Sequence, residues 1–195
     1  MASPAWLTIN THLTLYHGCL GIAAARIRAG VNPAVGRPAT DFGTGFYTTT
    51  RFDQAEEWAR HVHSVKYPAG NPADPPTVVK FVVPLNGLAG LNSLPFVRGD
   101  SSNGTFWSFV AQCRAGHSHA HPVRIPPGDW YDTVVGSVAS WPPKAGFPPC
   151  SLGEWNGVDW TAYDQFSFHT AAAAAELNRL DRGNAAEFEV ITLTP

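Results

Sequence analysis

Residues 41–51 read Asp-Phe-Gly-Thr-Gly-Phe-Tyr-Thr-Thr-Thr-Arg, a glycine-rich turn that leads into a run of β-branched residues. Glycine permits the tight turn, and the run from Phe46 to Thr50 has the composition of a strand. Upstream, Leu15-Tyr-His-Gly18 places His17 at the end of a short apolar segment. Together these stretches predict two strands, one that ends at a histidine and one that carries Tyr47.

Length and composition predict a single folded domain. The 195 residues are 44% hydrophobic and 12% aromatic, which is enough for a buried core. We therefore expect one domain over 1–195, with its core at about 13–193 and an enlarged loop, rich in tryptophan and proline, at about 141–160. A formal charge of −2 with 14% charged residues gives no basic patch that would by itself drive nucleic-acid binding.

The N-terminal residues, the apolar runs and the cysteines indicate the compartment in which to expect the protein. The first ten residues lack the charged start and apolar core of a signal peptide, and the apolar runs are too short to cross a membrane. The scattered Cys19, Cys113 and Cys150 argue against a disulfide framework. We expect no membrane association and a protein that is cytoplasmic as synthesised, with delivery to another cell without an N-terminal signal left open. The sequence does not indicate the oligomeric state.

Strand and helix patterns alternate irregularly along the chain. Apolar and β-branched runs predict strands at 13–16, 46–50, 78–83, 130–138, 163–170 and 187–193. Apolar residues at helical spacing predict helices at 20–28, 51–65, 105–114 and 171–180. The helix at 51–65 is expected to have Thr50 as its N-cap and Trp58 on its apolar face. Because strict βαβ alternation is missing, the order predicts an α+β fold with a mixed, mainly antiparallel sheet.

The segment 163–170, Tyr-Asp-Gln-Phe-Ser-Phe-His-Thr, alternates along a strand, so Asp164 and Gln165 face opposite sides. In chain order, His17, Tyr47 and Gln165 resemble the histidine, tyrosine and glutamate that form the active-site framework of ADP-ribosyltransferases of the diphtheria-toxin and poly-ADP-ribose polymerase class. The resemblance implies a split, mainly antiparallel β-sheet core with flanking helices, and NAD as co-substrate.

A closer resemblance is to a branch of that superfamily with an H-Y-D signature, a domain family of unknown function. It rests on segments that follow one another in the expected order, namely 41–47, Asp53-Gln-Ala-Glu-Glu-Trp-Ala59, 107–114, Tyr131-Asp-Thr-Val-Val-Gly-Ser-Val138 and Tyr163-Asp-Gln-Phe166. The resemblance implies an enzyme that cleaves the nicotinamide–ribose bond of NAD and transfers ADP-ribose to a protein or nucleic acid, as a toxin or effector. Transfer to water would make it an NAD glycohydrolase.

The residue types suit the roles that this resemblance implies. His17 can bind a ribose hydroxyl, the backbone of Gly18 can approach the carboxamide because glycine has no Cβ, and Tyr47 can stack on nicotinamide. Further contacts with NAD are expected around the tyrosine and from arginines that suit phosphate, namely Gly45, Phe46, Thr48, Arg51 and Arg37.

Gln165 departs from the glutamate of the resemblance. Glutamine keeps the hydrogen bond but loses a charge interaction worth roughly 4 kcal/mol at about 4 Å and an effective dielectric constant of about 20. Our hypothesis is that Asp132, near the start of its own strand, supplies the acid from a neighbouring strand while Gln165 binds the ribose. Asp164 is the other acid close in sequence, although alternation along the strand turns it away.

Other functions stay open at this point. Without an acid, the domain would be a catalytically inactive module that binds NAD or ADP-ribose. A carbohydrate-binding or scaffold domain built on exposed tryptophans is a third possibility, and the tryptophans of 141–160 also suit a loop that recognises the target. No metal site is expected, because the alternating His117, His119 and His121 have no cysteine or carboxylate nearby.

Overall fold

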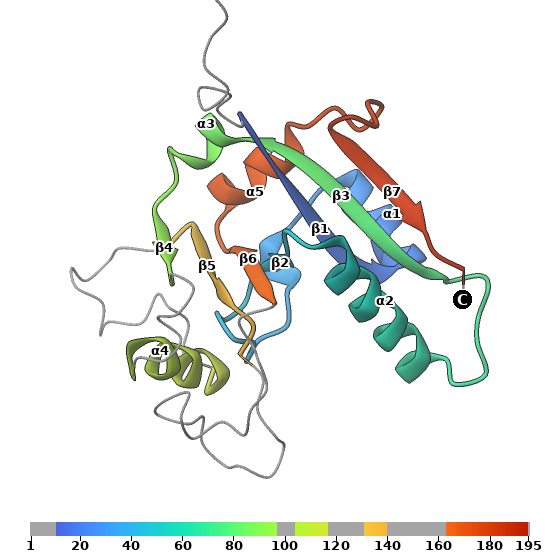
Figure 1. Ribbon diagram of the computed structural model, residues 1–195, viewed down its shortest axis with the longest axis horizontal. Coiled ribbons are helices and arrows are strands. Elements are labelled where there is room, and N and C mark those ends of the chain that lie inside the picture. The colour runs from blue at the N-terminus through green and yellow to red at the C-terminus, as the bar shows by residue number, and fades with distance from the viewer. Residues whose placement is uncertain (1–10, 97–103, 117–130, 140–162, 195) are drawn as a thin grey trace, which may run out of the picture.

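The computed structural model describes residues 11–96, 104–116, 131–139 and 163–194. The strands form two small sheets (Figure 1). Sheet A is antiparallel, in the order β1 (His12–Leu20), β3 (Pro76–Pro84), β7 (Phe188–Thr192). Sheet B has the order β2 (Phe46–Thr48), β6 (Asp164–Phe168), β5 (Thr133–Ser137), β4 (Ser93–Pro95), and the pair β4–β5 is parallel while the others are antiparallel. The expected α+β fold with mainly antiparallel strands is confirmed.

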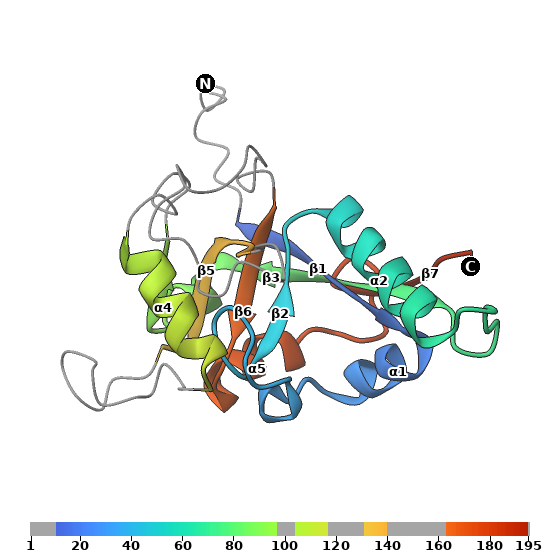
Figure 2. The ribbon, with the colours of Figure 1, turned by 90° about the horizontal axis from the view of Figure 1, so that it is seen from below.

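Helices flank both sheets (Figures 1 and 2). They are α1 (Gly21–Ala29), the 3₁₀ helix η2 (Pro33–Val35), α2 (Phe52–Lys66), α3 (Leu85–Leu88), α4 (Gly104–Arg114) and α5 (Ala171–Asn178). The helices predicted from the sequence correspond to α1, α2, α4 and α5. The prediction missed β4 and α3, which span three and four residues and are too short to show a periodic pattern.

Helix α2 packs against β1 through its smallest side chains. Ala55 and Ala59 are buried, whereas Trp58 is 55% exposed, so the prediction that Trp58 faces the core is wrong. The helix approaches the strand closely at Gly18, where an added Cβ would be only 2.0 Å from the backbone oxygen of Ala55. The helix lies so close to the strand that large side chains do not fit between them.

The start of α2 is held by a residue far away in the sequence. The prediction of Thr50 as N-cap is wrong: the N-cap position is Arg51, and its N–H donates to the hydroxyl of Thr49 over 3.1 Å. Thr50 instead donates its backbone N–H and its hydroxyl to the carboxylate of Asp164. This carboxylate ties the start of α2 to β6.

A large apolar core connects the two sheets. It contains side chains of β1 and β3, of α1 and α5, and Phe168 of β6. A second cluster lies on the opposite face of sheet B, where Val134 of β5 joins Phe42, Phe106 and Val110. Sheet B is therefore covered on both faces, and Gln165 points to the face of the second cluster, away from Phe168.

Candidate functional site

The two sheets meet edge to edge beside His17. Tyr16 of β1 and Thr49, which follows β2, exchange two backbone hydrogen bonds of 2.8 and 2.9 Å. Strand β1 continues to Leu20, so His17 lies within the strand, whereas the sequence placed it at the strand's end. This contact brings the histidine of one motif next to the tyrosine of the other.

His17 is oriented by the backbone of β2. Its Nδ1 lies 2.6 Å from the backbone oxygen of Tyr47. A carbonyl oxygen can only accept, so Nδ1 carries the proton and donates. The ring also stacks on Phe46, with centroids 4.4 Å apart. Burial lowers the pKa of His17 below its ordinary value, an effect that the bond to Tyr47 partly offsets. The imidazole is therefore neutral at physiological pH, with its lone pair on Nε2.

The backbone of Gly18 faces the same edge. Because Tyr16 directs its N–H and C=O to Thr49, strand alternation directs those of Gly18, two residues on, to the same side and away from β3. Among the described residues, none forms a hydrogen bond with the N–H or the C=O of Gly18 on this edge. One donor and one acceptor thus lie next to His17, while the Cα side of Gly18 is covered by α2.

The hydroxyl of Tyr47 fastens the glycine turn. It accepts from the N–H of Phe42 over 3.0 Å, donates to the oxygen of Gly43 over 2.6 Å and lies 2.7 Å from Oγ1 of Thr40. Gly43 has a φ of 81°, a conformation that favours glycine. Burial raises the pKa of Tyr47 well above its ordinary value, so the phenol stays protonated. The hydroxyl is thus used within the fold, and the half-buried ring is the part left for a ligand.

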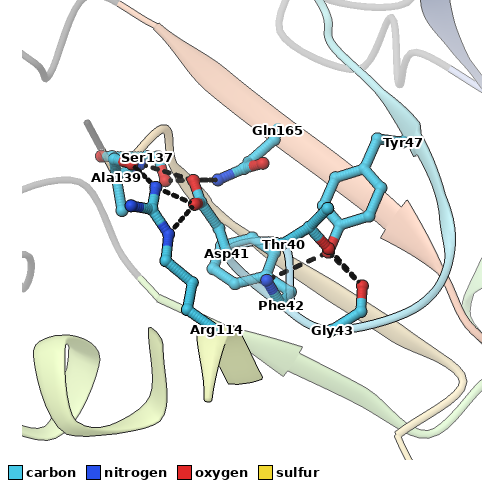
Figure 3. A network of polar contacts seen from close by, with 9 residues as sticks. All are labelled: Thr40, Asp41, Phe42, Gly43, Tyr47, Arg114, Ser137, Ala139 and Gln165. Carbon is cyan, nitrogen blue, oxygen red and sulfur yellow. Dashed lines mark hydrogen bonds and ion pairs between the residues drawn. The ribbon is translucent and has the colours of Figure 1, made fainter. Parts of the chain in front are cut away.

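The same turn positions a buried carboxylate, Asp41 (Figure 3). Its Oδ1 accepts from Nε of Arg114 over 2.9 Å and also from Nη2 of that residue. Its Oδ2 accepts from the N–H of Ala139 over 2.8 Å and from Nε2 of Gln165 over 2.7 Å. Arg114 also donates to the oxygen of Ala139. A buried carboxylate, a half-buried guanidinium and a buried amide therefore form one connected unit.

This arrangement fixes how Gln165 presents its amide. Nε2 donates to Oδ2 of Asp41 and, over 3.1 Å, to the backbone oxygen of Ser137. Two acceptors on this side identify it as the NH₂ side. Oε1 then points away from Asp41 (Figure 3) and bonds to none of the described residues. Gln165 offers a fixed acceptor.

The three positions that carry the resemblance are thus connected. His17 bonds to the backbone of Tyr47, the Tyr47 hydroxyl fastens the turn, and Asp41 in that turn bonds to Gln165. Sequence reasoning missed the part played by Asp41 and Arg114. Asp41 opens the quoted motif, a position that could have drawn attention to it, whereas nothing in the sequence distinguishes Arg114.

Asp132, our candidate acid, is not brought to this unit. It precedes β5, while Gln165 pairs with Gly136 near the other end of that strand. Its Oδ1 accepts from the hydroxyl of Thr170 and its Oδ2 from the N–H of Asn92, over 3.0 Å. Asp132 therefore holds the start of α5 and the entry to β4.

The residues around Tyr47 that we expect to contact NAD also make contacts within the fold. An added Cβ on Gly45 would be 2.7 Å from Nδ1 of His169, so this glycine permits close packing. Thr48 is buried and donates its hydroxyl to the oxygen of Phe166. Arg51 pairs with Asp53 and lies over the ring of Tyr163. Arg37 is exposed.

A sequence model of a family described as protein of unknown function (DUF3990) matches residues 13–141, more than half of the chain. The chain belongs to this family. Neither a curated protein nor a solved structure matches the chain significantly. The part that matches DUF3990 includes His17, Asp41, Tyr47 and Arg114, and it ends before Gln165.

The rest of this DUF3990 chain adds few candidates. Among the described residues, no group of three or more His, Cys, Asp or Glu could hold a metal ion. In the same part of the chain, no helix is long and apolar enough to cross a membrane. Cys19 and Cys113 are free and buried, and burial raises the pKa of each thiol to about 12. Cys150, His117, His119, His121 and the loop at 141–160 lie outside the described residues.

Proposed function

We propose that this protein is an NAD-dependent ADP-ribosyltransferase. It breaks the nicotinamide–ribose bond of NAD and passes ADP-ribose to a protein or nucleic acid, in the manner of a toxin or effector. The proposal rests on the connected hydrogen bonds of His17, Tyr47 and Gln165, the positions at which the sequence resembles that superfamily. Two small sheets that meet at an edge are also what the resemblance implies.

The nicotinamide would lie at the edge between β1 and β2. The outward N–H and C=O of Gly18 complement the oxygen and the NH₂ of a carboxamide. The ring of Tyr47, fixed through its hydroxyl, offers a flat surface for stacking. Both contacts orient the leaving group without any change in the fold.

Two neutral acceptors would bind the ribose. Nε2 of His17 carries a lone pair, because Nδ1 donates to Tyr47, and Oε1 of Gln165 is directed away from Asp41. Hydroxyl groups of the ribose can donate to both. Such bonds orient the sugar and place electron density near the carbon on which positive charge develops as nicotinamide leaves.

A second function is favoured by one observation: position 165 carries no charge, and Asp132 does not reach it. On this ground the alternative is a module that binds NAD or ADP-ribose without turnover. NAD hydrolysis, with water as the acceptor, is a variant of the leading proposal that differs only in the second step.

The test is release of nicotinamide from NAD by the purified chain, alone and with cell lysate that supplies acceptors. His17→Phe keeps a ring against Phe46 but removes both nitrogens, and we expect at least a 100-fold loss of release. Trp58→Ala, on the exposed side of α2, is the control and should release nicotinamide at the wild-type rate.

The outcomes separate the candidates. Release that depends on His17 supports the transferase, and labelled NAD in the same mixture then shows whether protein, nucleic acid or water receives the ADP-ribose. NAD binding by calorimetry without release would support the binding module. A chain that neither binds NAD nor releases nicotinamide would refute both.

A further inference from the structure

Asp41 and Arg114 form an ion pair that joins the glycine turn to α4 and to the segment after β5. Asp41 is 8% exposed and accepts from the guanidinium, from a backbone N–H and from Gln165. The carboxylate is nearly out of water, which costs free energy unless its oxygens are hydrogen-bonded, whereas the side chain of Arg114 stays 30% exposed. Besides joining these segments, the pair lies where it orients one specific amide.

The bond between Asp41 and Gln165 has an electronic consequence. A hydrogen bond from an amide N–H to a carboxylate is stronger than one to a neutral acceptor. Such a bond polarises the amide and shifts electron density toward its oxygen, as in cooperative hydrogen-bond chains. Oε1 of Gln165, at the opposite end of the amide from Asp41, thereby becomes a better acceptor.

We infer that Asp41, held by Arg114, is a positioning residue that orients and polarises Gln165, so that Oε1 takes the place of a glutamate oxygen toward the ribose. The inference deepens the proposed function and rests on it. The charge that the sequence lacks at 165 is present one hydrogen bond away, and it acts through the amide rather than by touching the sugar.

The local geometry predicts that a glutamate at 165 would work poorly. The NH₂ side of Gln165 faces two acceptors, Oδ2 of Asp41 and the oxygen of Ser137. In Gln165→Glu a carboxylate oxygen would face both, and its charge would repel Asp41 unless one of the two takes up a proton. In an enzyme that merely lacks its glutamate, the same change would raise activity.

The first experiment follows the side-chain amide of Gln165 by ¹⁵N NMR in the full chain. We expect its protons to resonate downfield of ordinary glutamine amides in the wild type and to move upfield in Asp41→Asn. Gln54, whose amide donates to the oxygen of Asp164, is the internal control and should not move. A Gln165 resonance that is unchanged in Asp41→Asn would overturn the inference, whether or not the protein cleaves NAD.

The second experiment measures kcat and KM for nicotinamide release. Asp41→Asn should lower kcat at least ten-fold per folded molecule, while KM for NAD should change by less than three-fold. A general loss of folded protein would not lower kcat when it is expressed per folded molecule. Gln165→Glu should also lower kcat at neutral pH. It leaves Asp41 and Arg114 in place, so it carries the test if Asp41→Asn does not fold.

The results distinguish the two proposals. A rise in kcat for Gln165→Glu, or an unchanged kcat for Asp41→Asn, would overturn the role of Asp41 while leaving the transferase intact. No release by the wild-type protein would refute the proposed function, and the NMR comparison then decides alone whether Asp41 positions the amide.

Discussion

Nδ1 of His17 lies 2.6 Å from the backbone oxygen of Tyr47, so the second residue of the motif orients the first. The bond settles which nitrogen carries the proton and leaves Nε2 as an acceptor. It also spans the junction of the two sheets, where Tyr16 and Thr49 exchange backbone bonds. A change at this junction would alter the orientation of His17 and the packing of the two sheets together.

Removing the Tyr47 hydroxyl should destabilise the glycine turn. Tyr47→Phe leaves the N–H of Phe42 without its acceptor, while the oxygen of Gly43 keeps only the hydroxyl of Thr40, and we expect a loss of about 1–3 kcal/mol in the free energy of unfolding. Urea denaturation measures it. Tyr16→Phe is the matched control, because its hydroxyl bonds to none of the described residues. Equal effects of the two changes would contradict the role given to the Tyr47 hydroxyl.

A methyl group on Gly18 should push α2 away from β1. The new Cβ would be 2.0 Å from the oxygen of Ala55, a backbone atom that cannot rotate aside. We expect Gly18→Ala to cost at least about 2 kcal/mol of stability. In Gly90→Ala the nearest atom would be 3.8 Å away, and the change should stay within about 0.5 kcal/mol. Thermal unfolding of both variants checks this, and a fully stable Gly18→Ala would show that α2 packs differently.

Asp132 should matter for stability and not for chemistry. Asp132→Ala removes the acceptor for Thr170, whose hydroxyl accepts from the N–H of Ala173 at the start of α5, and we expect a loss of about 1–3 kcal/mol. Thr170→Ala should destabilise to a similar degree. Nicotinamide release per folded molecule should stay within three-fold of the wild type. A loss of turnover with unchanged stability would restore Asp132 as the acid.

Stability should fall in mild acid because of His169. Its Nδ1 donates to the oxygen of Thr44 and its Nε2 pairs with the hydroxyl of Ser167, both over 2.8 Å. Burial lowers its pKa from 6.5 to about 4. Between these values the unfolded chain binds the proton and the folded chain does not. The stabilisation is therefore complete above about pH 6.5 and is lost as the pH falls toward 4, by an amount on the order of 2–3 kcal/mol.

Urea denaturation at pH 7.5, 5.5 and 4.5 measures that loss. In His169→Gln the titrating group is gone, so the slope of stability against pH between these values should be shallower. His17, whose pKa burial also lowers, acts in the same direction and contributes to the part that remains. An identical slope in wild type and variant would rule out His169 as the source.

The local sequence pattern was sufficient to predict most helices and strands, and to predict which side chains of β6 point to which side of the sheet. The strict alternation of 163–170 placed Asp164 and Gln165 on opposite sides, and the structure confirms it: Asp164 bonds to Thr50 and Gln165 to Asp41. The apolar face of α2 was predicted incorrectly at Trp58, because periodicity does not reveal how closely a helix approaches a strand. That distance is set by Gly18, in another element.

The sequence by itself determined the α+β class and the order of the main strands and helices, because strand and helix patterns depend on neighbours along the chain. The candidate residues His17, Tyr47 and Gln165 came from a resemblance to a family and stay a prediction. Only the tertiary structure decided which acid belongs to Gln165. Asp41 and Gln165 are 124 positions apart, and Asp132 and Thr170 are 38 apart. Hydrogen-bond partners at such separations follow from how sheets and turns pack. Asp132, the acid that the sequence suggested, therefore accepts from Thr170 at the start of α5, and Asp41, which opens the turn, bonds to Gln165.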